Sequence, residues 1–208
     1  MTSMASSKTH FYIRNIYKSN SKSSVTPQIN LSVVSQQKHQ EESPKQTTHQ
    51  KGLSGKKPDY LGVQKNPPGL ALCPATKNCV STSENISDLT HYAPPWNYNP
   101  EQGRGSKNPV SKEQAMEELL EVVETTKPDD FRPKVAEQRD DYVRVEYESP
   151  FLGFVDDVEF WFPPGEKSIV QYRSASRLGH FDFDMNRKRI KALRVALEKK
   201  GWASEKSL

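Results

Sequence analysis

Three short runs of this chain, residues 143–147, 157–162 and 168–176, have apolar side chains at every second position. A period of two is that of a β-strand with one buried face. The connections between the runs are short, and the segment 163–166, Pro-Pro-Gly-Glu, is a good hairpin turn. The pattern therefore predicts an antiparallel meander, with a further short strand near Val135.

Two segments that flank these runs have apolar residues at helical spacing. The first begins near Ser111, whose hydroxyl suits an N-cap, and ends before Pro128. The second runs from about Asp184, a candidate N-cap, to Lys200, and Gly201 suits the left-handed position after a helix. The predicted fold is α+β and two-layered, an antiparallel sheet of three to four or more strands packed by an N-terminal and a C-terminal helix.

The first 60 residues differ in composition from the rest of the chain. They hold nine Lys and Arg against three Asp and Glu, whereas residues 61–208 hold 21 against 23. Residues 1–40 contain no acid and 12 Ser and Thr. Such a composition is typical of an organelle transit peptide, and the Ser/Thr share favours the chloroplast. We predict a transit peptide and disordered linker over 1–60, one domain over 61–208, and a location in the chloroplast stroma; a merely disordered tail is the alternative.

Residues 61–108 contain several Pro and Gly pairs that interrupt regular structure. The segment also carries Tyr92, Trp96 and Tyr98, which are costly to leave in water. We expect an extended arm that wraps the domain and is anchored by these aromatic side chains.

Cys73 and Cys79 are the two cysteines of the chain. Their spacing allows a small disulfide loop, which would be reversible in a compartment of changing redox state, and two reduced, partly buried thiols are the alternative. A structural zinc site needs four ligands, and no second Cys/His pair has suitable spacing. No metal site is predicted, and no cofactor is indicated.

Opposite charges concentrate in two neighbouring stretches. Residues 113–166 hold 16 acids and five bases, and residues 167–200 hold ten bases and three acids. The predicted hairpin brings Asp157 and Glu159 opposite Arg173. Either a structural ion-pair network or a polar pocket for a carboxylate or phosphate would result. The candidate ligand-binding residues are Asp156, Asp157, Glu159, Arg173, Ser174, Ser176, Arg177, His180, Asp182, Asn186 and Arg187.

These candidates support three classes of function. We favour a soluble, non-catalytic binding or accessory domain for a small anionic ligand or a partner protein. The alternative is a hydrolase or isomerase that uses His180 with the Asp/Arg cluster, although no nucleophile elbow or phosphate-binding loop is present. Nucleic-acid binding through the basic last helix is weaker, because the acidic sheet would repel phosphate. Runs without a polar side chain, such as 69–73, are far too short to cross a membrane.

Taken together, these motifs resemble the family called domain of unknown function 1499. The points of similarity are Cys73-Pro-x-x-x-Asn-Cys79-Val-Ser, His91 before a double proline, Asp156-Asp157-Val-Glu159-Phe160, Arg173-Ser-Ala-Ser-Arg177 and Asp182-x-x-x-Asn186-Arg187-Lys-Arg189. The resemblance covers about residues 68–200. It implies a plant, plastid-directed member and supplies no activity, but it places the polar constellation within the family's motifs.

Overall fold

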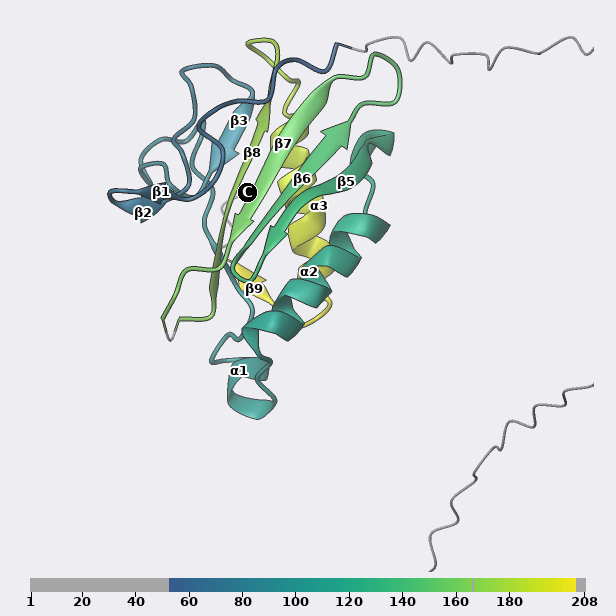
Figure 1. Cartoon of the computed structure of the whole chain (residues 1–208). Coiled ribbons are helices and arrows are strands. Elements are labelled where there is room, and N and C mark those ends of the chain that lie inside the picture. The colour runs from purple at the N-terminus through teal and green to yellow at the C-terminus, as the bar shows by residue number, and fades with distance from the viewer. Residues whose placement is uncertain (1–52, 166, 205–208) are drawn as a thin grey trace, which may run out of the picture. The chain divides into compact units, whose positions relative to one another are not determined.

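The computed structural model describes residues 53–165 and 167–204, so most of the predicted transit peptide and linker lies outside the described residues. Figure 1 shows the arrangement of the elements. In chain order they are β1 (Gln64–Lys65), β2 (Pro68–Gly69), β3 (Cys79–Ser81), β4 (Trp96–Asn97), α1 (Arg104–Lys107), α2 (Lys112–Thr125), η1 (Pro128–Asp130), β5 (Arg132–Arg139), β6 (Tyr142–Glu148), β7 (Val155–Trp161), β8 (Ile169–Ser176), α3 (Met185–Glu198) and β9 (Ala203–Ser204).

The four long strands β5, β6, β7 and β8 form an antiparallel meander, as the period-two pattern predicted. The second edge of β8 is shared by two short strands, since β3 pairs with residues 173–175 and β4 with residues 169–170. Strand β9 then pairs with β4. The sheet among the described residues is therefore wider than the predicted meander, and a separate two-stranded hairpin is formed by β1 and β2.

The helices α2 and α3 begin and end close to the predicted positions. The hydroxyl of Ser111 accepts a hydrogen bond from the Gln114 backbone N–H at 3.2 Å, which confirms the predicted N-cap of α2. Gly201 has a φ of 92° after α3, a left-handed conformation that glycine adopts without a steric penalty. Asp184 is the N-cap residue of α3, as predicted, but its side chain makes no capping hydrogen bond. A carboxylate oxygen of Asp182 accepts from the Asn186 N–H instead.

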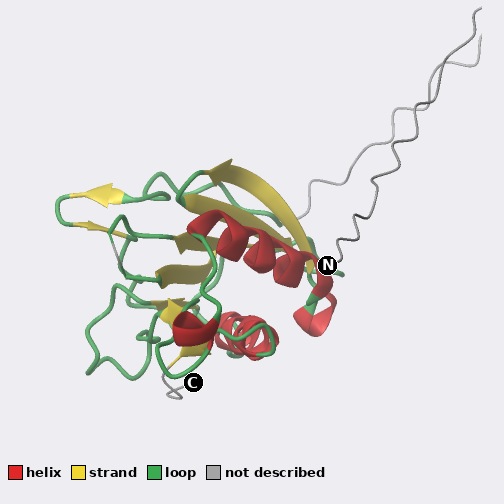
Figure 2. Ribbon diagram, turned by 90° about the horizontal axis from the view of Figure 1, so that it is seen from below, coloured by secondary structure: helices red, strands yellow, loops and turns green. Residues whose placement is uncertain are grey.

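One hydrophobic core joins the helices to the sheet. It includes Leu119 of α2, Val158 of β7 and Leu193 of α3, all without exposed surface. Figure 2 shows both long helices on the same side of the curved sheet, and we call the sheet face toward them the inner face. Trp96 is 1% exposed and belongs to this core, so the segment 61–108 contributes strands and core residues rather than only an external arm.

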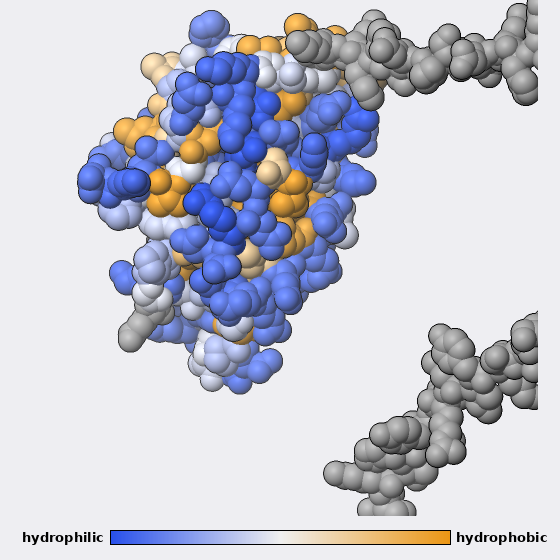
Figure 3. Space-filling model, viewed as in Figure 1, coloured by the Kyte–Doolittle hydropathy of each residue, from blue (hydrophilic) through white to orange (hydrophobic). Residues whose placement is uncertain are grey.

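The opposite face of the sheet, the outer face, carries the side chains that alternate with the core residues. Part of it is covered by the arm, which we define as residues 53–72, through a small cluster of Leu70 with Tyr142 and Trp161. Charged and polar side chains dominate much of the molecular surface in Figure 3. Among the described helices, none combines the length and the apolar character that a membrane span requires.

Candidate functional site

Four of the charged side chains on the outer face form one compact network. Asp157 accepts hydrogen bonds from Nε of Arg177 at 2.7 Å, from Nη2 of Arg177 at 2.8 Å and from Nη1 of Arg144 at 3.0 Å. Glu146 accepts from the same two arginines at 2.6 and 2.8 Å. Next to them lies the pair of Glu159 and Arg173, which face each other in the register of β7 and β8.

The electrostatics of Arg177 and Glu146 follow from this geometry. The hydrogen bonds from Arg177 to the Asp157 carboxylate hold the pKa of the guanidinium above its usual value. Burial acts to raise the pKa of Glu146, but the hydrogen bonds from Arg144 and Arg177 outweigh burial and leave that pKa below its usual value. Both arginines are thus neutralised by carboxylates of the same face, which leaves little of their charge for a ligand.

Glu159 and Arg173 are fully buried beneath the arm. The closest approach of their charged groups is 3.6 Å, from Nη1 of Arg173 to Oε2 of Glu159. The other Glu159 oxygen accepts from the Tyr142 hydroxyl at 2.8 Å and from the Gly62 N–H at 2.7 Å. The ring of Tyr60 lies 4.8 Å from the Arg173 guanidinium carbon. Burial raises the pKa of Glu159 above its usual value despite these favourable contacts.

A second polar network lies on the inner face, between the sheet and the start of α3. The Asn186 side chain accepts from the Ser174 hydroxyl at 2.6 Å and donates to Ser176 at 2.9 Å and to Asp182 at 2.7 Å. Nη2 of Arg189 donates to the buried carboxylate of Asp156 at 2.6 Å. This network fixes α3 on β7 and β8, because every contact joins the helix or its cap to a strand or to the adjoining turn.

The predicted candidates therefore do not converge on one site. Asp156 and Asp157 are adjacent in a strand, so their side chains point to opposite faces. Glu159 faces Arg173 as predicted, whereas Asp157 pairs with Arg177 and Arg144. His180 is exposed, and no hydrogen bond or ion pair found among the described residues includes it.

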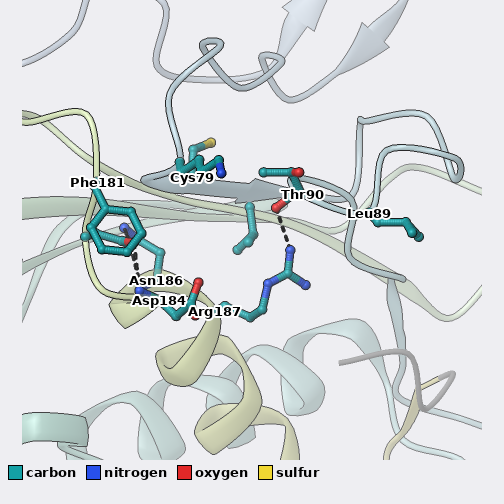
Figure 4. A pocket seen from close by; sticks show the side chains of 10 residues that line it. Cys79, Leu89, Thr90, Phe181, Asp184, Asn186 and Arg187 are labelled. Atoms are coloured by element: carbon teal, nitrogen blue, oxygen red, sulfur yellow. Dashed lines mark hydrogen bonds between the residues drawn. The ribbon is translucent and has the colours of Figure 1, made fainter.

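A pocket of about 140 Å³ opens beside the start of α3, and Figure 4 shows its lining side chains. Arg187 reaches across it from α3, and its Nη2 donates to the Thr90 carbonyl oxygen at 2.6 Å. Val80 and Phe181, which precedes the helix, supply apolar side chains to the lining, and the exposed Leu89 lies at its edge. The remaining lining residues are Lys77, Cys79, Asp182, Asp184 and Asn186.

The loop 73–79 forms one wall of this pocket and is closed by a disulfide. Cys73 and Cys79 are bonded, with their Cα atoms 5.7 Å apart. Asn78 fixes the loop to the other wall, because its side chain donates to the Gly179 carbonyl at 2.8 Å and its own carbonyl accepts from Asn186 at 3.0 Å. The disulfide and these hydrogen bonds together determine where Lys77 lies.

Several residues of the site were missed by the sequence analysis. Arg144 and Glu146 alternate with the core residues of β6. The sequence pattern therefore indicated that they lie on a polar face of the strand, but not that they belong to a site. Lys77, Leu89 and Phe181 reach the pocket from loops that have no period, and their position depends on the tertiary fold. Within the residues described, no group of His, Cys, Asp and Glu side chains is placed to hold a metal ion.

Most of the basic side chains predicted to form one face of the last helix are engaged in contacts within the protein. Arg189 pairs with Asp156, Arg194 pairs with Glu198 at 3.1 Å, and Arg187 donates to a backbone carbonyl. Lys188 and Lys191 remain exposed on α3. Two exposed lysines provide little positive charge for binding the phosphates of a nucleic-acid backbone.

The fold and these networks define an α+β domain with an ion-paired sheet and a pocket beside its last helix. The chain belongs to the family described as "Protein of unknown function (DUF1499)", whose sequence profile matches residues 69–197. The matched range contains both polar networks, the pocket and the disulfide, but not Tyr60 or Gly62 of the arm. Searches of curated proteins and of solved structures gave no match.

Proposed function

We propose that the chain is a non-catalytic binding domain for a small ligand that carries an anionic group on an apolar body. The observation that carries the proposal is the pocket beside α3, where Lys77 and Arg187 line the same space as Leu89 and Phe181. Cationic side chains next to an apolar wall suit a ligand of that chemistry.

The lining of this pocket holds two bases, Lys77 and Arg187, and two acids, Asp182 and Asp184. No ion pair among the described residues includes Lys77 or Arg187. Of the two acids in the lining, Asp182 is occupied by the N–H groups of Asp184 and Asn186, at 3.0 and 2.9 Å. The pocket also lies at the start of α3, where the helix dipole adds positive potential. The arginines of the outer face, by contrast, are neutralised by carboxylates.

We favour binding over catalysis because His180, the candidate general base, has no hydrogen-bonding partner among the described residues that would orient it. A general base is usually oriented by a second group within hydrogen-bonding distance. His180 is exposed, and Asp157, Arg173 and Arg177 of the proposed catalytic cluster lie in contacts of their own on the outer face. The hydrolase or isomerase alternative would require His180 to approach these residues.

We also propose a chloroplast location for this binding domain. The support is the acid-free, Ser- and Thr-rich composition of residues 1–40, which lie outside the described residues. A plant, plastid-directed member of the family would have such a segment before its domain.

Calorimetric titration with phenyl phosphate, phenol and inorganic phosphate tests the proposed ligand chemistry. Phenyl phosphate should bind more tightly than either fragment, because it alone offers both the anion and the ring. Arg187→Gln and Lys77→Gln should each weaken binding about tenfold, since a hydrogen bond to a charged group contributes ~1.5–3 kcal/mol.

The matched control is Lys191→Gln, which removes an exposed lysine of the same helix that does not line the pocket. It should bind phenyl phosphate as the wild type does. Equal binding by Arg187→Gln and the wild type, or preference for phenol over phenyl phosphate, would contradict the proposal.

A further inference from the structure

Large apolar side chains project into solvent from two loops at one end of the sheet. Phe151 is 94% and Leu152 57% exposed in the loop 149–154, and Phe181 is 55% and Phe183 73% exposed in the loop 177–184. Both loops emerge at the same end, because Glu148 pairs with Val155 and Asp156 pairs with Ser176 in the sheet register. We call this set of four side chains the apolar tip.

The backbone holds the apolar tip in place. In the first loop, Ser149 and Phe154 are joined by two hydrogen bonds, so that Phe151 and Leu152 lie at the end of a closed turn. In the second loop, Phe183 has a φ of 56° and the next residue a φ of 62°. A phenylalanine in the left-handed region is unusual, and such strain is found at sites where a side chain must be held in a given position.

The arm adds to the same end of the molecule. The Leu53 N–H donates to the Leu152 carbonyl oxygen at 3.1 Å, and Leu53 is itself exposed. Gly55 packs so closely on the next loop that a Cβ atom there would lie 3.0 Å from the Leu178 side chain. Figure 3 shows apolar residues on the surface at this end of the described domain.

Basic residues outnumber acids around the apolar tip. Lys56 and Lys57 follow Gly55, Lys77 forms a backbone bridge with Phe181, and Arg187 and Lys188 lie in the first turn of α3. The acids of these segments are Asp59, Asp182 and Asp184. The surroundings of the tip are therefore weakly positive, which complements an anionic surface.

We propose that the apolar tip docks the domain on an anionic lipid surface, with the phenylalanine and leucine side chains inserted at the headgroup boundary and the lysines facing the headgroups. A lipid surface fits better than a protein, because the side chains stand out singly from two loop ends, whereas protein interfaces bury a broad, closely packed patch. This docking surface goes beyond the ligand pocket and does not depend on a ligand, although Phe181 borders both.

The experiment is flotation of the full chain with vesicles of phosphatidylcholine alone and with about one third phosphatidylglycerol. The variant is Phe151→Ser with Phe183→Asn, chosen because both side chains are exposed and asparagine tolerates a positive φ. Residues 1–52 are the same in wild type and variant, so their basic charge contributes equally. Thermal unfolding of the variant, followed by circular dichroism, should match that of the wild type.

We expect the wild type to float with the anionic vesicles and to keep part of this binding in high salt, where electrostatic attraction is screened. The double variant should lose at least about tenfold in that salt-resistant binding. Val195→Ser, which removes an exposed apolar side chain of α3 away from the tip, is the control and should float as the wild type does.

Three results would overturn the proposal. The first is a wild type that does not float with either vesicle, and the second is a double variant that floats in high salt as well as the wild type. The third is a wild type that self-associates through the tip, seen as a dimer by size exclusion that the double variant abolishes, without vesicle binding.

Discussion

Asp157 and Arg177 are joined by two parallel hydrogen bonds, from Nε to Oδ2 at 2.7 Å and from Nη2 to Oδ1 at 2.8 Å, on a face of the sheet that water barely reaches. Arg144 approaches the same carboxylate from the neighbouring strand. The arrangement makes Asp157 the shared counter-ion of two buried arginines, so its charge matters more to the fold than that of a surface acid.

Asp157→Asn should therefore destabilise the protein by about 3 kcal/mol, because it leaves the guanidinium groups of Arg144 and Arg177 with only the partly exposed Glu146 as a shared carboxylate. Urea denaturation midpoints measure the loss. Glu148→Gln is the matched control, since Glu148 pairs with Arg132 across the same sheet but both side chains are exposed. Similar midpoints for the two variants would show that the Asp157 network is no more than a surface ion pair.

Glu159→Gln should gain stability relative to the wild type as the pH rises. Burial raises the pKa of Glu159 in the folded protein, while the unfolded chain keeps the ordinary value of 4.5. Between the unfolded and folded pKa values, the folded protein holds a proton that the unfolded chain has released. The contribution of Glu159 is thus fully present below the unfolded pKa and is lost as the pH rises through the folded pKa.

The measurement is the free energy of unfolding in urea for both proteins between about pH 4 and pH 8. The difference, variant minus wild type, should become more favourable with rising pH, because glutamine does not titrate. Glu148→Gln, at an exposed carboxylate of the same sheet, is the control for the substitution itself. A difference for Glu159→Gln that falls with pH would mean that the contacts with Arg173 and Tyr142 outweigh burial.

Reduction of the Cys73–Cys79 disulfide should cost about 2 kcal/mol, the value that loop-closure entropy gives for a small loop. Thermal unfolding with and without dithiothreitol measures the change, and peptide mapping without reductant should find the two peptides joined. The double variant Cys73→Ser, Cys79→Ser should unfold at the same temperature with and without dithiothreitol. Free thiols in the oxidised protein would disprove the bridge.

A fluorescent fusion of residues 1–60 should enter chloroplasts. The reason is the acid-free, basic composition, so the same fusion with Arg14→Glu and Lys18→Glu should import poorly. Cytosolic fluorescence of the unchanged fusion would refute the targeting proposal. Deletion should stop at residue 52 rather than 60, because Tyr60 packs on Arg173.

The elements that were predicted best from the sequence are those in which apolar residues recur with a regular period over several turns or residue pairs. Helix α2, strands β6 to β8 and helix α3 each repeat a pattern over seven residues or more, and Ser111 marks its helix by local chemistry alone. Strands β3, β4 and β9 hold two or three residues, too few to show alternation. Their pairing is determined by the free edge of β8 and by the burial of Trp96, which depend on the folded chain.

The candidate site was predicted less well for a related reason. The predicted hairpin correctly placed Glu159 of β7 opposite Arg173 of β8, but the candidate list ignored the strand alternation that puts Asp156 and Asp157 on opposite faces. Asp184 occupies the N-cap position of α3, but the capping hydrogen bond is accepted by Asp182, and the positive φ values of Phe183 and Asp184 were indicated by no sequence pattern. The pocket is lined by residues from three separate loops and from α3, and only the tertiary structure brings Lys77 and Arg187 to the same pocket.

The most direct test of the proposed binding function is to map phenyl phosphate onto the protein by amide chemical shifts in ¹⁵N-labelled full-length chain. The shifts should concentrate at Lys77, Thr90, Phe181 and Arg187, and they should need about tenfold more phenyl phosphate in Arg187→Gln but the wild-type amount in Lys191→Gln. Shifts centred instead on Arg173 and Arg177 of the outer face, or none at the start of α3, would contradict the assignment of this pocket as the ligand site.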